Sequence, residues 1–509
     1  MNPKESSRSQ ETKTAAADAP VTKRPPAGIV FFTEGPVGHH IIRMAIPMTW
    51  GMLASVLAAL ADTYFLAQLG TAHLAAITFT FPVVMLVMNL SLGLASGFSS
   101  LLARALGEGN MIKVENLTIS AMLMSGLIVF ALSVVGYLTI DPLFTALGAG
   151  EQTLPLIRDF MSIWYFSMIL VVTPIIGNFA LRATGNPKTA SYVMIVSALV
   201  NVLLDPIFIF GFGFIPEMGI KGAALAGVVS RLAAFLVMFY MLTYRTRLIT
   251  FKLPDLTTML VSWKEILRIG APLAMTNMVT PLSIALITRL LAQYSENIVA
   301  GFGVAARIEA LAIIPLIAVG SSFGPISGQN FGAEKYARIV ELIKYGFVFA
   351  GIYGLSCAAL MAVFHQSLPG FFDANPDVVY TAGLYLLVVP IGYIGLGITM
   401  VVGASFTGMG NPRPSMIMSL LRLSVVYLPL AYIGAKLFGP IGIFGANALA
   451  NLSVALGAGI FIALEARQAV LAGKIDYSTV SLLVPKSLAT KALNNSAINE
   501  RGEEDIDKR

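Results

Sequence analysis

The stretch TGNPKTAS at residues 184–191 returns as MGNPRPSM at residues 409–416. The same offset in residue number relates IRMAIP at 42–47 to LRIGAP at 267–272. This constant spacing, which pairs position 184 with position 409, is called the repeat offset below. Because the same offset holds for matches that begin at residue 42 and at residue 184, a duplicated unit explains them better than coincidence does. The chain is therefore predicted to consist of two similar halves.

The composition is that of a membrane protein. Of the 509 residues, 56% are hydrophobic and 12% are charged, and the mean hydropathy is +0.79. Soluble domains contain about 25% charged residues, so a soluble cytosolic enzyme is excluded. The single Cys357 excludes an intrachain disulfide, and the four histidines lack metal-ligand spacing, so we expect no metal centre. The net charge of +6 is interpreted as basic membrane loops rather than nucleic-acid binding.

Twelve apolar stretches are long enough to cross a bilayer at about 20 residues each. The first six lie at about 39–67, 74–103, 113–140, 154–183, 188–211 and 220–245. The second six lie at about 264–293, 299–329, 336–364, 377–408, 413–437 and 441–470. The predicted fold is an all-α integral membrane protein with two six-helix bundles related by the internal repeat.

The repeat divides the chain into five regions. We expect an N-terminal tail at 1–38, an N-terminal lobe at 39–245, a linker at 246–263, a C-terminal lobe at 264–470 and a C-terminal tail at 471–509. Six crossings return the chain to the same side, so both halves have the same orientation. Parallel repeats of this kind are typical of transporters with a central cavity between two lobes.

Positive charge is concentrated in the loops on one side of the predicted membrane. Ten basic residues follow even-numbered helices: Arg104, Lys113, Arg182, Lys188, Arg245, Arg247, Lys252, Lys335, Arg338 and Arg413. Two follow odd-numbered helices: Lys221 and Lys436. By the positive-inside rule, the linker and both termini are expected in the cytoplasm, with the protein in a cell membrane, the inner membrane if the source is bacterial.

Several motifs resemble those of the multidrug and toxin extrusion (MATE) family. They are ADTYFLAQLGTAHLAAIT at 61–78, ATGNPKTA at 183–190, NVLLDPIFIFG at 201–211 and MGIKGAALA at 218–226. The resemblance implies a V-shaped transporter with two lobes. Some branches of the family have a glutamate where Thr280 stands here, so the chain is more similar to the prokaryotic DinF-like branch. Related flippases of lipid-linked saccharides belong to the same superfamily and remain an alternative.

Two acids interrupt long apolar runs, Asp62 in LAALADTYF and Asp205 in NVLLDPIFIF. An ionisable residue inside a membrane is a functional hypothesis by default. Asn201 precedes Asp205 by four residues and therefore shares its helix face. The positions one repeat offset later are all apolar: Ile287, Val426 and Leu430. The polar site is therefore predicted in the N-terminal half alone.

The functional interpretation of Asp62, Asn201 and Asp205 is a site for ion coupling and substrate binding, where protons exchange or sodium binds. The alternative is that each acid is a neutral, hydrogen-bonded packing residue. By resemblance, the three residues occupy the positions of the proton-linked polar cluster of prokaryotic MATE transporters. A tyrosine that some members have one turn earlier is replaced here by Ala58.

Prolines and further charges lie within other predicted spans. Pro47 and its repeat counterpart Pro272 interrupt the hydrogen-bond ladder and permit kinks. By resemblance they lie in helices that bend during transport, and the alternative is a pair of tolerated bends. Glu309 and Arg422 lie at similar depth in the C-terminal half and are a candidate ion pair. Arg231 lies near the middle of the sixth span and is assigned no role.

The leading functional hypothesis is an antiporter that exports amphipathic, often cationic drugs in exchange for entering protons or sodium. The expected partners are these small molecules and the lipid bilayer, with no nucleic acid, no cofactor besides the transported ion, and a monomeric state. No P-loop or H-E-x-x-H pattern occurs, so an ATP-driven pump or intramembrane metalloenzyme is disfavoured. A flippase is the runner-up, although it would need a basic central cavity. A channel is disfavoured because one asymmetric acidic site suits alternating access better.

Overall fold

The computed structural model describes residues 29–213, 215–249 and 252–480, and all regular elements in these ranges are helices. The N-terminal half contains α2 (Val37–Gln68), α3 (Thr71–Gly107), α4 (Met111–Leu138), α5 (Ile140–Ala146), α6 (Leu154–Ser167), α7 (Ile169–Ala183), α8 (Pro187–Phe210), α9 (Ile220–Tyr240) and the π-helix η1 (Met241–Arg245). Residues 1–28 of the predicted N-terminal tail and residues 481–509 of the predicted C-terminal tail lie outside the described residues.

The C-terminal half repeats this order with additional breaks. It contains α10 (Leu256–Leu291), α11 (Glu296–Ala312), α12 (Ile314–Gly332), α13 (Tyr336–Phe364), α14 (Ser367–Gly370), α15 (Pro376–Val388), the 3-10 helix η2 (Val389–Gly392), α16 (Tyr393–Gly408), α17 (Arg413–Leu420), the π-helix η3 (Leu421–Tyr427), α18 (Leu428–Phe438), α19 (Pro440–Leu471) and α20 (Tyr477–Val480).

The predicted number of spans agrees with the structure. In the described part of the chain, ten helices are long and apolar enough to cross a bilayer, and two bent pairs bring the total to twelve if each pair is one span. These pairs are α6 with α7, bent by 52°, and α11 with α12, bent by 47°. Large apolar side chains such as Trp50 and Phe166 are exposed, as is typical of a protein that lipid surrounds.

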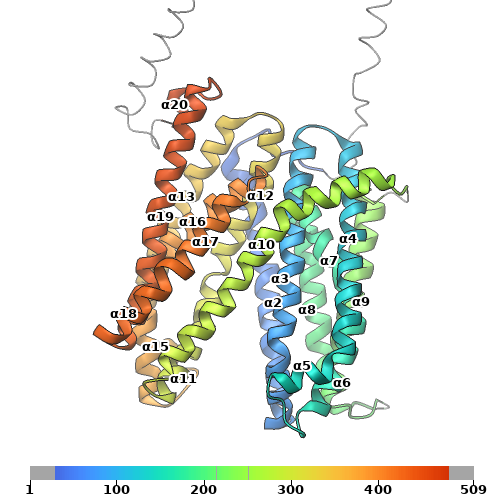
Figure 1. Ribbon diagram of the computed structural model, residues 1–509, viewed down its shortest axis with the longest axis vertical. Helices are drawn as coiled ribbons and strands as arrows, with labels where there is room; N and C mark the ends of the chain where they lie inside the picture. Colours follow the sequence, from blue (N-terminus) through green and yellow to red (C-terminus); the bar gives the residue numbers. More distant parts are fainter. Residues whose placement is uncertain (1–28, 214, 250–251, 481–509) are drawn as a thin grey trace, which may run out of the picture.

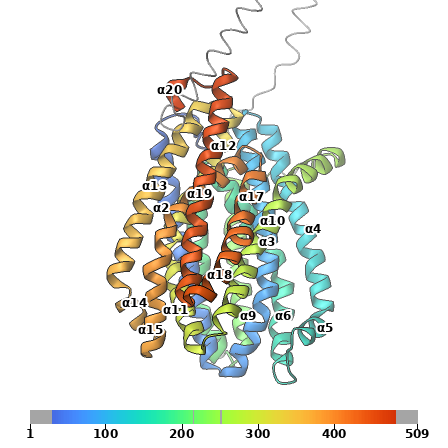
Figure 2. The same ribbon diagram turned by 60° about the vertical axis from the view of Figure 1, so that its left-hand side comes forward.

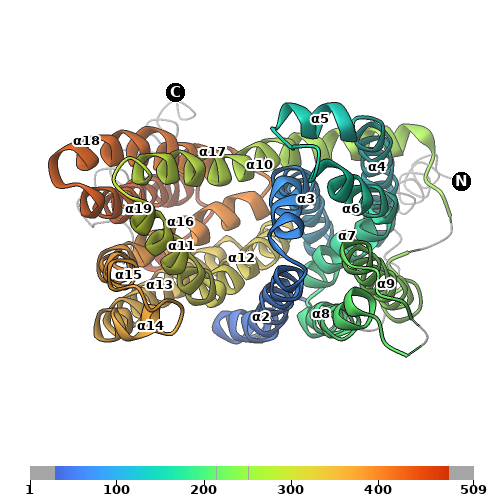
Figure 3. The same cartoon turned by 90° about the horizontal axis from the view of Figure 1, so that it is seen from below.

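The helices form two lobes that meet at one end (Figure 1). This end, called the termini end, carries the first and last described residues, and the ribbons of the two lobes diverge toward the opposite end. Helices α3 and α2 of the N-terminal lobe pack against α10 and α12 of the C-terminal lobe, as the view along the bundle shows (Figure 3). Within the C-terminal lobe, α11 packs against α15 near the opposite end (Figure 2).

A seam of glycines closes the two lobes at the termini end. A Cβ atom on Gly107 would collide with the carbonyl of Gln329, and a Cβ atom on Gly332 would collide with the carbonyl of Arg104. Gly107 and Gly332 are related by the repeat offset, and so are Arg104 and Gln329. The seam is therefore a twofold contact in which only glycine allows the backbones to approach so closely.

The described part of the predicted N-terminal tail, residues 29–36, packs into this seam. The Phe32 side chain is completely buried, and its backbone N–H donates to Oε1 of Gln329 (2.7 Å). Nη2 of Arg338 donates to the carbonyls of Phe32 (2.9 Å) and Gly35 (2.8 Å). Asn330 adds a hydrogen bond from Nδ2 to the Phe32 carbonyl (3.3 Å). This part of the predicted tail is therefore a structural element that links α2 to α12 and α13.

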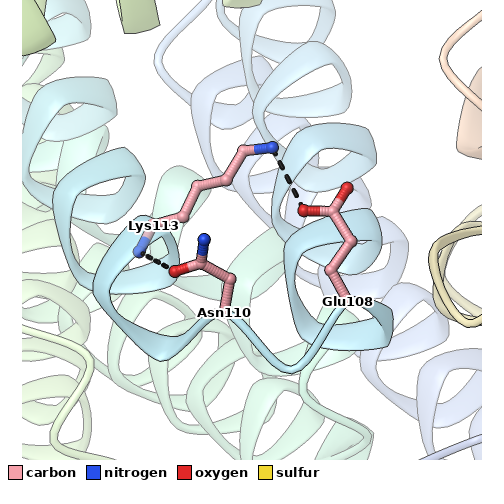
Figure 4. A network of polar contacts seen from close by, with 3 residues as sticks. All are labelled: Glu108, Asn110 and Lys113. Carbon is pink, nitrogen blue, oxygen red and sulfur yellow. Dashed lines mark hydrogen bonds and ion pairs between the residues drawn. The ribbon is translucent and has the colours of Figure 1, made fainter. Parts of the chain in front are cut away.

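The turn between α3 and α4 has a simpler local network (Figure 4). The Asn110 side chain caps α4 by accepting a hydrogen bond from the backbone N–H of Lys113 (3.0 Å). Nζ of Lys113 also pairs with Oε2 of Glu108 (3.2 Å) on the exposed surface. Lys113 corresponds to Arg338 at the repeat offset, so equivalent basic residues hold different partners in the two halves.

Helix α10 begins within the range 246–263 that was predicted as the linker. Helix α10 begins at Leu256, because the Asp255 side chain accepts hydrogen bonds from the backbone N–H (3.0 Å) and hydroxyl (2.6 Å) of Thr258. These bonds hold the pKa of the Asp255 carboxyl below its usual value. The added turns bring Trp263 to α4, where its indole N–H donates to the carbonyl of Ser120 (2.9 Å). The C-terminal lobe thus begins beside the N-terminal lobe.

Candidate functional site

The structure brings the three residues of the predicted coupling site together inside the N-terminal lobe. Helices α2 and α8 pack side by side, and Asp62 on α2 lies close enough to Asp205 on α8 to interact electrostatically. The Asp205 side chain is fully buried, and its Oδ1 accepts a hydrogen bond from Nδ2 of Asn201 (3.0 Å). The second oxygen, Oδ2, is buried without a hydrogen-bond partner. One carboxylate oxygen is therefore available for a proton or a cation.

A partly buried arginine completes this cluster. Arg231 on α9 interacts electrostatically with Asp62, although no ion pair within 4.0 Å joins them in the described chain. Its Nη1 atom donates to the Ser167 hydroxyl (2.9 Å) at the end of α6. The cluster thus contains two acids and one fixed cation, and protonation or ion binding at the acids changes its net charge.

The repeat counterparts of the coupling residues are packing residues. Ile287 is 1% exposed and belongs to the apolar core of the C-terminal lobe, while Val426 and Leu430 pack against that core. The C-terminal lobe nevertheless has a polar network at other positions, so the asymmetry concerns the coupling positions and not buried polarity as a whole. The counterparts of Asp62, Asn201 and Asp205 alone do not reveal this network, because its members lie at other positions.

The polar network of the C-terminal lobe is centred on Glu309 of α11. The Tyr385 hydroxyl donates to Oε2 of Glu309 (2.5 Å), and the buried Tyr393 hydroxyl lies close to the same carboxyl. Arg422 interacts electrostatically with Glu309, but the described chain contains no ion pair within 4.0 Å between them. The direct ion pair considered from the sequence is therefore not formed in the described chain. Nη1 of Arg422 instead donates to Oδ1 of Asn451 (3.2 Å).

The two prolines considered as hinges lie inside continuous helices. Pro47 is in α2 and Pro272 is in α10, and neither helix is divided at its proline. The sharp bends between helices occur instead at Met168, between α6 and α7, and at Ile313, between α11 and α12. The role of the prolines as hinges therefore stays a prediction.

A central cavity of about 400 Å³ lies between the lobes. Its wall is formed by side chains from α3, α7, α10, α12, α16, α17 and η3. Two of the lining residues are the cations Arg182 and Arg422, and none of the described lining residues is an acid. Several others carry hydroxyls: Ser96, Ser99, Ser100, Thr276, Thr399 and Thr407. The acid cluster and the central cavity are therefore lined by different residues of opposite charge.

One functional candidate in the structure was not predicted from the sequence, and another had no predicted role. The charge pattern predicts Arg182 to be a loop residue, but it lies in the last turn of α7, is 7% exposed and faces the cavity. A signal was present, because Arg182 precedes the GNP turn and so still belongs to the apolar span. Arg231 lies within a long apolar run, which is the same signal that singled out the two aspartates.

Known proteins match both the sequence and the fold. The MatE family model matches residues 47–207 and 272–433. The chain is 34% identical over 419 residues to a FAD transporter of Shewanella oneidensis, covering 82% of this chain and 93% of the relative. It is 27% identical over 444 residues to the multidrug export protein MepA of Staphylococcus aureus, covering 85% of this chain and 95% of the relative.

A solved structure of a multidrug resistance MATE transporter in an outward-facing conformation has a TM-score of 0.80 and 25% identity, over 86% of this chain and 98% of that one. The family match to both halves of the repeat, the similarity to the two relatives and the structural match of the same architecture agree with one another. The chain therefore belongs to the multidrug and toxin extrusion (MATE) family and is a multi-pass membrane transporter with two lobes.

Proposed function

We propose that this protein is an antiporter that couples the inward movement of protons or sodium to the outward movement of amphipathic small molecules. Asp62, Asn201 and Asp205 bind the coupling ion, and no cofactor takes part. The observation that carries the proposal is the completely buried Asp205 carboxyl, which has one oxygen bonded to Asn201 and the other unpaired. A buried carboxylate without a full set of partners is unfavourable unless it is protonated or binds a cation.

The transport cycle follows from the position of the seam. With the lobes joined at the termini end, the coupling ion reaches Asp62 and Asp205 from the opposite end. With both acids ionised, the two carboxylates and Arg231 carry one net negative charge, and the arrival of one proton or sodium ion neutralises it. We propose that this change alters the packing of α2 against α8, with Pro47 as the bending point, and so releases a substrate outward. The seam then opens while the lobes close at the other end.

The positive-inside pattern supports the placement of this cycle in the cell. Most loop cations lie at the termini end, so we propose that this end faces the cytoplasm and that the protein resides in the cell membrane. A monomer suffices, since the acid cluster and the central cavity are each complete within one chain.

Two substrate classes have separate support. The match to the multidrug export protein MepA and the acid cluster favour amphipathic cations. The match to a FAD transporter and the two arginines of the central cavity favour a flavin nucleotide as the second candidate. The basic cavity also meets the requirement of a flippase of lipid-linked saccharides, which therefore remains an alternative with lower support from the relatives.

Transport by purified protein in proteoliposomes tests this proposal. Export of the cation ethidium and of FAD is measured separately under an imposed proton gradient and an imposed sodium gradient. We expect one of the gradients to drive at least one compound, and Asp205→Asn to abolish that movement. Equal movement with and without gradients would contradict antiport. Export of neither compound by a correctly folded protein would contradict the substrate classes proposed here.

A further inference from the structure

The central cavity contains a buried guanidinium that nothing in the described protein neutralises. Arg182 is 7% exposed, and it makes neither a hydrogen bond nor an ion pair with any described residue. Its only charge-related contact there is the Phe179 ring, whose centroid lies 4.0 Å from the guanidinium carbon. Arginines are almost never buried so completely without a partner. Because Arg182 lines the cavity, the missing partner is expected there.

A second guanidinium approaches the same cavity from the other lobe. Arg422 lies in the π-helix η3, a backbone distortion that is frequent at functional sites. Asn451 accepts a hydrogen bond from its Nη1 atom, which orients the side chain, while its Nε atom is buried without a partner. Glu309 does not form an ion pair with it in the described chain. Donor capacity on Arg422 is therefore also left unused.

The rest of the lining suits an anion as well. No acid lines the cavity among the described residues, and hydroxyl groups such as those of Ser96, Thr276 and Thr399 supply additional donors. The planar fork of arginine matches the oxygens of a phosphate group, with which it forms two parallel charge-assisted hydrogen bonds. Two forks suit a group that carries more than one negative charge.

We propose that the central cavity binds the phosphate or diphosphate group of a soluble substrate through Arg182 and Arg422. This inference rests on the proposed function, since it assigns the chemical class of the compound that is transported. The two arginines belong to different lobes, so the bound anion contacts both lobes at once. Substrate binding then depends on the distance between the lobes. Occupancy of the cavity is therefore linked to the movement of the lobes that opens and closes the cavity.

The test is direct binding of radiolabelled pyrophosphate to the full-length protein in nanodiscs of phosphatidylcholine. We expect saturable binding, and we expect Arg182→Gln and Arg422→Gln each to weaken it about tenfold or more, the loss typical of a hydrogen bond to a charged group. Arg182→Lys keeps the charge but loses the fork, so an intermediate affinity is expected. Arg289→Gln is the matched control, because it removes the same charge from a position near the end of α10 that does not line the cavity.

Three results would overturn the inference. The first is the absence of saturable pyrophosphate binding by the folded wild-type protein, and the second is unchanged binding in the folded Arg182→Gln, Arg422→Gln double variant. The third is loss of pyrophosphate binding when phosphatidylglycerol is added to the nanodiscs, which would assign the arginines to lipid headgroups. Binding needs no ion gradient, so gradient-driven ethidium export without pyrophosphate binding would overturn this inference while the antiporter proposal stood.

Discussion

The two lobes have the same helical architecture but place their buried polar groups at different positions. The N-terminal lobe has Asp62 and Asp205 where the C-terminal lobe has Ile287 and Leu430. In the opposite direction, three members of the C-terminal network correspond to apolar residues of the N-terminal lobe: Glu309 to Val84, Tyr385 to Phe160 and Tyr393 to Met168. The repeat therefore specifies the scaffold, while each lobe has its own internal charges.

The arginines of the central cavity likewise have no charged counterpart at the repeat offset. At the repeat offset, the counterpart of Arg182 is Thr407, and the counterpart of Arg422 is Ser197. A substrate in the cavity therefore meets one cation from each lobe at positions that the repeat does not relate. By contrast, the seam at Gly107 and Gly332 keeps the repeat symmetry in full. The Gly107–Gly332 contact between the lobes is symmetric, and the groups proposed to bind ions or substrate are not.

The largest expected effect comes from the acid that has no counterpart. Asp205→Asn should reduce gradient-driven export to the background of empty liposomes, because Asn has the shape of a protonated Asp but cannot exchange a proton. Leu430→Asn is the matched control at the equivalent position of the other lobe, and export should stay close to wild type because Leu430 is only partly buried. Both variants are measured at equal reconstituted amounts. Comparable losses in the two variants would mean that the lobes do not differ in coupling.

The symmetric seam should respond equally from either side. Gly107→Ala and Gly332→Ala each introduce a Cβ atom into a backbone contact, and overpacking of this kind destabilises by about 1–3 kcal/mol. Either change should shift the protein toward conformations in which the lobes are separated at the termini end. Spin labels at Glu108→Cys and Glu334→Cys, in a Cys357→Ser background, report this as a longer distance. A response from only one glycine would show that the seam is not a twofold contact.

The polar network of the C-terminal lobe is expected to contribute to stability rather than to coupling. Glu309→Gln weakens the charge-assisted hydrogen bond from Tyr385, and such bonds contribute about 1.5–3 kcal/mol. The midpoint of thermal unfolding should therefore decrease, while export keeps the same dependence on the imposed proton or sodium gradient. If Glu309→Gln removed the ion dependence without loss of stability, coupling would have to be assigned to both lobes.

The smallest effects are expected at Arg338 and Lys113, two basic residues that the repeat offset relates. Arg338→Ala removes hydrogen bonds to the carbonyls of Phe32 and Gly35 and should accelerate amide hydrogen exchange at residues 29–36. Lys113→Ala removes one exposed ion pair with Glu108, which contributes about 0–1 kcal/mol, and should leave that exchange unchanged. Hydrogen exchange with mass spectrometry measures both. Equal protection of residues 29–36 in the two variants would contradict the assigned role of Arg338.

Hydropathy and spacing along the chain were enough to predict the membrane class, the number of spans, the duplication and the two acids within the spans of the N-terminal lobe. These features are one-dimensional, since they can be read along the chain without knowledge of its path. Asn201 could be placed beside Asp205 for the same reason, because a separation of four residues defines one face of a helix.

The packing of the helices instead determines which charged side chains lie close together. Arg231 approaches Asp62 because α9 packs on α8 and α8 on α2, and Arg182 and Arg422 line one cavity because the lobes converge at the termini end. The sequence separation between these residues is large, and helix tilt and rotation determine which side chains face inward. The missing partner of Arg182 and the position of residues 29–36 in the seam depend on the same three-dimensional packing.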